Sequence, residues 1–215
     1  CCDLGAGALN ALQSHIAPED LDSVVISHLH ADHCVDLFAL RVYMFWGPGR
    51  GRRIRLIGPP GLREALVGFA GSDGWDECFD IEIVTPPRDV RTVGDAGLVF
   101  REVPHSHPTF AVRIEHGDRS VIYGADCRYG EELAELARGG GILIAECGDG
   151  ASTRDDTVHM SGAEAGAGAA AAGGGRLLLT HCYPEHDRAA TLEAARGAFA
   201  GDVAWAEQGT RLDVR

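Results

Sequence analysis

The segment 28–33, His-Leu-His-Ala-Asp-His, constrains this chain more than any other part of its sequence. It follows the apolar run 24–26 almost directly, so it is expected to leave the end of a short strand. Neutral imidazole offers a nitrogen lone pair that suits zinc and similar ions. On an extended backbone His28 and His30 project to the same side and can chelate one ion, while the aspartate and the last histidine face a second. The segment therefore predicts half of a two-metal site.

Length and composition predict one globular domain over residues 1–215. No apolar stretch approaches the roughly 20 residues that cross a bilayer, and no signal peptide is visible, so we expect a cytoplasmic protein without membrane contact. The seven cysteines form no CxxC pair, and their odd number argues against a secreted disulfide scaffold. A formal net charge of −13 favours a small-molecule substrate over long nucleic acid.

Helices and strands are expected in three successive patterns. The first third predicts strands at 24–27 and 53–57, helices at 34–46 and 60–70, and a loop at 73–79. Short β runs follow at 81–84, 98–103, 111–115 and 120–123, with Gly117-Asp118 as a tight turn. The last third predicts helices at 130–138, 162–172 and 186–200, alternating with strands at 142–146, 177–180 and 203–206. This order favours an α/β (α+β) chain whose sheets are covered by helices.

Three further residues come soon after predicted strands, where rigid elements hold coordination geometry best. They are His105, Asp126 and His181. A pair of metal ions needs more ligands than the segment 28–33 supplies, and histidine and aspartate are both suitable metal ligands. His107 lies two residues beyond His105 and could replace it as the ligand.

Taken in order, these residues resemble the ligand set of the metallo-β-lactamase superfamily, and Asp3-Leu-Gly5 resembles its first short motif. The resemblance implies a four-layer αββα sandwich with two divalent metal ions. It assigns one ion to His28, His30 and His105, and the other to Asp32, His33 and His181, with Asp126 bridging. Zinc is expected because histidines dominate, although the aspartates would also accept manganese or iron.

Two segments resemble the ribonuclease Z and phosphodiesterase branch of that superfamily. In the first, His105 precedes a proline by three residues and an arginine by eight. In the second, His159 stands where ribonuclease Z has a histidine that assists catalysis, and Glu146 matches a glutamate commonly found before it. The resemblance implies that His159 donates a proton to the leaving oxygen or steadies phosphoryl oxygens. Asp32 would orient a hydroxide bridging the ions. Glu146 would either hold a ligand imidazole or form a structural ion pair.

The chain departs from the superfamily pattern in two places. Ribonuclease Z enzymes that trim transfer RNA carry a long arm between the equivalents of His105 and Asp126. Here residues 106–125 are all needed for two predicted strands and their turn, so RNA processing is disfavoured. The pair of strands that precedes Asp3 in the superfamily has no counterpart here, so those strands are expected to be missing. The resemblance to the ribonuclease Z and phosphodiesterase branch also leads us to expect a homodimer.

The leading hypothesis is a dinuclear metal-dependent hydrolase that cleaves a small phosphodiester or nucleotide-type substrate. The two ions would lower the pKa of a bridging water, so that hydroxide exists near pH 7. The same hydroxide could instead attack a lactone or a thioester. Outside the enzymes, a metal-stabilised interaction subunit with a degenerate site is the alternative, and the intact ligand set argues against it.

Overall fold

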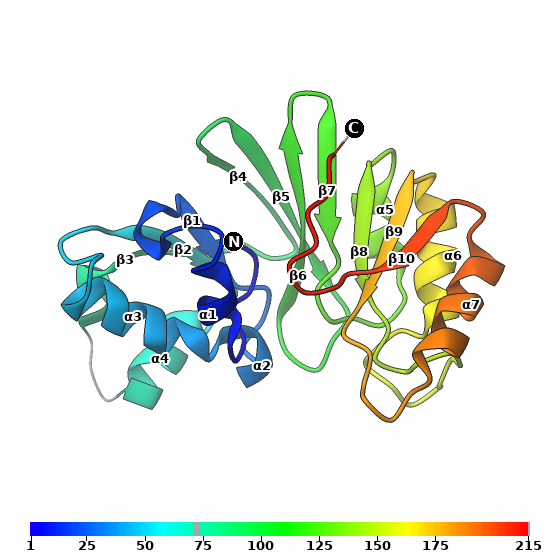
Figure 1. Ribbon diagram of the computed structural model, residues 1–215, viewed down its shortest axis with the longest axis horizontal. Coiled ribbons are helices and arrows are strands. Elements are labelled where there is room, and N and C mark those ends of the chain that lie inside the picture. The colour runs from blue at the N-terminus through cyan, green and yellow to red at the C-terminus, as the bar shows by residue number, and fades with distance from the viewer. Residues whose placement is uncertain (71–73, 215) are drawn as a thin grey trace. The chain divides into compact units, whose positions relative to one another are not determined.

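The computed structural model of the protein describes residues 1–70 and 74–214. The chain divides into two compact units, which meet in the sequence between Thr85 and Pro86. Each unit contains one sheet, and Figure 1 colours the first unit mainly blue to cyan and the second green to red. The predicted α/β class is confirmed, while a single domain over residues 1–215 stays a prediction.

The first unit is built on a parallel sheet in the order β1-β2-β3 (Ser23–Val25, Ile54–Gly58 and Phe79–Ile83). Its helices are α1 (Ala8–Leu12), α2 (Ala31–Cys34), α3 (Asp36–Trp46) and α4 (Leu62–Ala70), with 3₁₀ turns at Pro18–Asp20 and Gly74–Glu77. A buried cluster that includes Val24, Leu40, Leu56 and Phe79 forms the core of this unit. Every position of β1 is buried, which is typical of a parallel strand.

Two predictions in the first unit need correction. The helix predicted over 34–46 is present as α3 but begins two residues later, at Asp36, and a separate helical turn that the sequence did not predict, α2, precedes it at Ala31–Cys34. Asp32 and His33 therefore lie in a helical turn. The loop predicted over 73–79 contains a 3₁₀ turn at Gly74–Glu77 and the start of β3, and its first residue lies outside the described residues.

The second unit is built on a seven-stranded sheet in the order β10-β9-β8-β7-β6-β5-β4. The strands are Arg88–Val93 (β4), Ala96–Val103 (β5), Thr109–His116 (β6), Arg119–Tyr123 (β7), Ile142–Glu146 (β8), Arg176–Thr180 (β9) and Asp202–Trp205 (β10). Pairing is antiparallel from β4 to β7 and parallel from β7 to β10. The strands β5, β7 and β9 therefore run in the same direction, and their carboxyl ends lie at one edge of the sheet, where His105, Asp126 and His181 follow them.

Three helices cover this sheet: α5 (Glu131–Ala137), α6 (Gly162–Ala172) and α7 (Arg188–Ala198). They lie side by side and share a core with the strands, which includes Leu136, Ala169 and Leu177 (Figure 1). Gly166 allows α6 to approach α7 closely, because a Cβ there would lie 2.4 Å from the carbonyl oxygen of Ala195. Among the described residues, no helix is long and apolar enough to cross a membrane.

The strands predicted in the second unit are all present, and Gly117, with φ of +62°, turns the chain between β6 and β7 as expected. The sequence analysis missed β4. Its residues, Arg-Asp-Val-Arg-Thr-Val, carry three charges and stand at the edge of the sheet. Charged side chains are common on edge strands, where they discourage pairing with another chain, but they weaken the apolar alternation that predicts a strand.

Candidate active site

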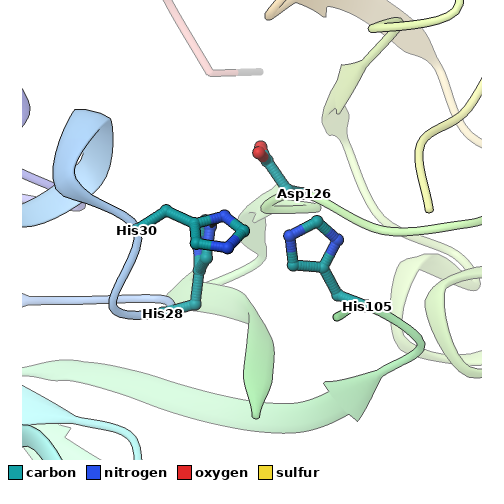
Figure 2. Close-up of side chains that lie close together, drawn as sticks. All are labelled: His28, His30, His105 and Asp126. Carbon is teal, nitrogen blue, oxygen red and sulfur yellow. Dashed lines mark hydrogen bonds between the residues drawn. The ribbon is translucent and has the colours of Figure 1, made fainter. Parts of the chain in front are cut away.

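In the first unit, the first two candidate ligands leave the carboxyl end of β1. Figure 2 shows the side chains of His28 and His30 on the segment that follows this strand. Nε2 of His28 lies 3.0 Å from Nδ1 of His30. A tetrahedral ion with bonds of 2.0–2.1 Å holds its ligand atoms about 3.3 Å apart, so this spacing fits two ligands of one ion.

The tautomer of His28 follows from its neighbours. The hydroxyl of Ser27 donates its one proton to the carboxylate of Asp3, at 2.7 Å. Its oxygen, 3.0 Å from Nδ1 of His28, can then only accept a hydrogen bond. Nδ1 of His28 therefore carries the proton, and Nε2 is the nitrogen that would bind a metal.

Asp32 and His33 form the other pair of candidate ligands in this unit. Oδ2 of Asp32 lies 3.5 Å from Nε2 of His33, again close to the separation expected across one ion. The side chain of Asp32 is mostly exposed, whereas that of His33 is buried. A buried imidazole and an accessible carboxylate can both ligate, and the carboxylate can also meet a water molecule.

Asp3 organises this half of the site, a role that the sequence analysis did not assign. Its carboxylate accepts hydrogen bonds from Nδ1 of His33 and from the backbone N–H of Ser27, both at 2.7 Å. The contact with His33 leaves Nε2 as the ligating nitrogen. Gly5 completes the motif, because a Cβ at this position would lie 1.8 Å from the carbonyl oxygen of Asp32. Only glycine lets the two segments approach so closely.

In the second unit, the candidate ligands come from three separate elements. His105 follows β5, Asp126 follows β7 and His181 follows β9, and Figure 2 shows the first two on separate segments. Oδ2 of Asp126 lies 3.2 Å from Nε2 of His181, which fits two ligands of one ion. Nδ1 of His105 lies 3.2 Å from the carbonyl oxygen of Val158. Such backbone contacts orient metal-ligating histidines, which favours His105 over His107 as the ligand.

Backbone strain accompanies these residues. Among the described residues, three that are not glycine have positive φ: Asp3, Ala125 and His181. One is the carboxylate that orients His33, one precedes Asp126, and one is itself a candidate ligand. Strained backbone tends to gather at functional sites, where the surrounding structure holds it in place.

His159 lies on the loop before α6 and is held from both sides. Nδ1 of His159 donates to the carboxylate of Glu146 at 2.8 Å, and Nε2 lies 2.9 Å from the hydroxyl of Tyr183. The loop is fixed by the hydroxyl of Thr157, which accepts from the backbone N–H of His159 and donates to Asp149. The imidazole is therefore oriented before any substrate arrives.

The helix that follows this loop is also fixed. Ser161 accepts from the backbone N–H of Glu164, and the carboxylate of Glu164 accepts from the backbone N–H of Ser161. This reciprocal pair is the capping box that the sequence predicts. It fixes the start of α6 at Gly162, three residues after His159.

Glu146 is 1% exposed and serves His159 rather than a candidate metal ligand. Burial raises the pKa of Glu146, and the hydrogen bond from His159 opposes that change. The same hydrogen bond raises the pKa of His159, against the opposing effect of burial. Donor atoms of Glu146, His159 and His181 lie close enough to hold an ion. However, both carboxylate oxygens of Glu146 also accept backbone N–H groups, from Cys127 and Gly148, so hydrogen bonding accounts for this group.

The structure thus pairs the predicted residues within each unit. The first unit pairs His28 with His30 and Asp32 with His33, and the second pairs Asp126 with His181. The assignment of these residues to two ions stays a prediction. Tyr183 was missed, although it stands two residues after His181 and could have been considered for that reason.

Comparison with known proteins decides the family. The profile of the Beta-lactamase superfamily domain matches residues 3–182. The chain belongs to the metallo-β-lactamase superfamily.

Relatives within the superfamily point to its hydrolases. An uncharacterized protein of Mycobacterium tuberculosis, Rv1339, is 35% identical over 94% of this chain and 76% of its own length. The probable metallo-hydrolase YhfI of Bacillus subtilis is 31% identical over 96% of this chain and 84% of its own length. A ribonuclease Z of a Mycobacterium species is 30% identical over 85% of this chain and 73% of its own length.

Solved structures show the same fold. The crystal structure of YhfI has a TM-score of 0.86 at 27% identity, covering 97% of this chain and 84% of that chain. A diphosphatase of the PhnP family has a TM-score of 0.70 at 17% identity, covering 100% of this chain and 79% of that chain. The chain is therefore a metallo-hydrolase of the metallo-β-lactamase fold, and its histidines and aspartates are candidate ligands of divalent metal.

Proposed function

We propose that this metallo-hydrolase cleaves a phosphodiester in a small, nucleotide-type substrate. His28, His30 and His105 would hold one divalent ion and Asp32, His33 and His181 the other, with Asp126 shared. The donor set fits such ions, because imidazoles and carboxylates meet at ligand spacing within each unit. Zinc is the expected metal, with manganese or iron as alternatives. When bound, two such ions activate water and neutralise charge on a phosphoryl group.

The observation that carries this proposal is the oriented imidazole of His159. Its ring centroid lies 5.4 Å from that of His181 and 5.3 Å from that of His105. A buried carboxylate fixes its Nδ1, so Nε2 is the atom on the side away from Glu146. An imidazole fixed beside two candidate ligands can steady a phosphoryl oxygen or protonate a leaving alkoxide. Asp32, whose carboxylate is accessible, would orient the attacking water.

The connection between His105 and Asp126 supports a small substrate. In the structure it consists of a short turn, β6, Gly117 with its neighbour, β7, and two further residues. It therefore contains no arm that could grip transfer RNA. The net charge of −13 also opposes binding of a long polyanion. Processing of RNA, as in ribonuclease Z, is accordingly disfavoured.

The test is a substrate panel on metal-free protein reconstituted with zinc, manganese or iron. The proposal predicts turnover of bis-p-nitrophenyl phosphate and of small nucleotide diesters with at least one metal, and none after chelation. Hydrolysis of lactones or thioesters alone would contradict it and favour the acyl alternative. Metal-replete protein that is inert toward all of these would favour an interaction subunit.

A matched pair of variants separates His159 from the other histidines. His159→Asn should lower kcat on diesters, while His15→Asn, at an exposed position in the first unit, should not. Equal effects of the two substitutions would contradict the role given to His159.

We further propose a cytoplasmic location and self-association. All seven cysteines are free thiols, which suits a reducing compartment. Trp46 on α3 and Phe69 on α4 are 71% and 74% exposed, and large apolar side chains at a surface favour association with a second chain. Light scattering on the eluting protein tests the dimer, and a monomer at micromolar concentration would contradict it.

A further inference from the structure

Tyr183 follows the candidate ligand His181 by two residues and is held in place by its surroundings. The backbone N–H of His186 donates to the carbonyl oxygen of Tyr183 at 3.0 Å, which closes the turn after β9. The phenol ring centroid lies 5.4 Å from that of His159, 5.6 Å from that of His181 and 6.5 Å from that of His186. Three rings and a closed turn therefore fix the position of this side chain.

A series of hydrogen bonds leads from the core to the hydroxyl of Tyr183. Backbone N–H groups of Cys127 and Gly148 donate to Glu146, Nδ1 of His159 donates to the same carboxylate, and Nε2 of His159 lies 2.9 Å from the tyrosine oxygen. The exposed fraction of the residues rises along this series of hydrogen bonds, from 1% for Glu146 to 38% for Tyr183. Tyr183 is thus more accessible to a substrate than the imidazole of His159, whose side chain is 12% exposed.

We propose that Tyr183 is a further residue of the reaction centre, whose hydroxyl contacts the phosphoryl or leaving oxygen of the substrate while His159 acts through it. This inference rests on the proposed diester hydrolysis. When both ring nitrogens of His159 carry protons, Nδ1 donates to Glu146 and Nε2 donates to the phenol oxygen of Tyr183. The one proton of the phenol can then be donated to a substrate oxygen. The nitrogen of His159 that points away from Glu146 is the one that Tyr183 contacts. A substrate would therefore meet the tyrosine first.

The first test is Tyr183→Phe, assayed on bis-p-nitrophenyl phosphate with the metal that supports the highest wild-type rate. We expect kcat to fall by about tenfold, the effect of one well-placed hydrogen bond, while KM changes by less than about twofold. Tyr129→Phe is the matched control, because Tyr129 is a similarly exposed tyrosine on the approach to α5. It should keep wild-type kinetics, and thermal unfolding of both variants should match that of the wild type.

A double variant tests whether Tyr183 and His159 act together. If His159 acts through Tyr183, adding His159→Asn to Tyr183→Phe should cost no further activity. Independent, multiplied effects would overturn the inference. So would a Tyr183→Phe enzyme with wild-type kcat, or one with a lower KM and a higher kcat, since the latter would mean that the tyrosine blocks His159.

A readout without turnover keeps this inference separate from the proposed function. In ¹⁵N spectra of the histidine rings, Tyr183→Phe should shift Nε2 of His159 and leave its Nδ1 unchanged, with His159→Asn identifying the signals. Unchanged Nε2 would overturn the hydrogen-bond chain itself. Wild-type protein inert toward every diester would overturn the proposed function, whereas an active enzyme indifferent to Tyr183→Phe would overturn this inference alone.

Discussion

Asp3 in the first unit and Glu146 in the second both accept a hydrogen bond from Nδ1 of a histidine, at 2.7 Å and 2.8 Å. Both carboxylates are largely buried, and both also accept backbone N–H groups. Asp3 accepts from His33, a candidate metal ligand, whereas Glu146 accepts from His159, which we propose to act on the substrate. The same carboxylate–imidazole hydrogen bond therefore orients a candidate metal ligand in one unit and a candidate catalytic histidine in the other. The hydrogen bond alone does not show which of these two roles a histidine has.

The largest expected effect tests whether both units supply ligands. His30→Ala in the first unit and His181→Ala in the second should each lower hydrolytic activity by about 10³-fold, because a catalytic ion supplies several kcal/mol of transition-state stabilisation. Steady-state kinetics on a diester measures this. His116→Ala is the control, since His116 is exposed at the end of β6 and pairs with the exposed Asp95. Full activity of either ligand variant would show that its unit contributes no essential ion.

The next effect concerns folding around the ligands of the first unit. Gly5→Ala should destabilise the protein by about 3 kcal/mol, because its Cβ would overlap the carbonyl oxygen of Asp32. Gly68→Ala, on an exposed helical position of the same unit with no atom within 4 Å of the added Cβ, should instead stabilise by up to about 1 kcal/mol. Urea unfolding measures both. Similar values for the two variants would mean that the approach of Gly5 to Asp32 is not tight.

Substitution of Asp3 should change metal affinity, whereas substitution of Glu146 should change kcat. Asp3→Asn should weaken metal binding by about 10- to 100-fold, because the contact that orients His33 is altered. Glu146→Gln should keep metal affinity and lower kcat by about tenfold, because it is His159 that loses its charged partner. Titration with a chromophoric chelator and diester kinetics separate the two outcomes. If Glu146→Gln weakened metal binding as much as Asp3→Asn does, the two carboxylates would have the same task.

The smallest expected effect concerns the stability contributed by a hydrogen bond at the surface of the first unit, in contrast to the buried carboxylate–histidine pairs. The hydroxyl of Tyr43 donates to Glu19 at 2.6 Å, which lowers the pKa of Glu19 and raises that of Tyr43. Because the folded pKa of Glu19 is lowered, its contribution is present above the unfolded value near 4.5 and is lost as pH falls through the folded pKa. Because the folded pKa of Tyr43 is raised, its contribution is present below 10 and is lost as pH rises through the folded value.

Tyr43→Phe removes both contributions. The stability difference between wild type and variant should be small, constant between about pH 5 and 9, and smaller at either extreme. Urea unfolding at a series of pH values measures it. A difference that grows toward low pH would contradict the direction assigned to Glu19.

How far the sequence predicts the site differs between the two units. The ligands of the first unit fall within residues 28–33, so their spacing alone points to a metal. Those of the second unit follow β5, β7 and β9, and only the resemblance to a known family joined them in advance. Asp3 and Tyr183 escaped assignment, because each acts by contacting a histidine that the fold, rather than the sequence, brings to it.

Helices and strands also differ in how well the sequence predicts them. Strands with continuous apolar runs, such as β8 and β9, lie where the sequence predicts them. The charged edge strand β4 was missed, and so was α2, the helical turn that precedes α3. In α2 the backbone is set by the contacts of Asp3 and Gly5 with His33 and Asp32, which local propensity does not reflect.

The most direct test of the two-ion proposal is the metal content of the purified protein, measured by elemental analysis after reconstitution and removal of excess metal. We predict about two divalent ions per chain in the wild type and in Glu146→Gln, and fewer in His30→Ala and His181→Ala. One ion or none in the wild type, or a full complement in both histidine variants, would contradict the account.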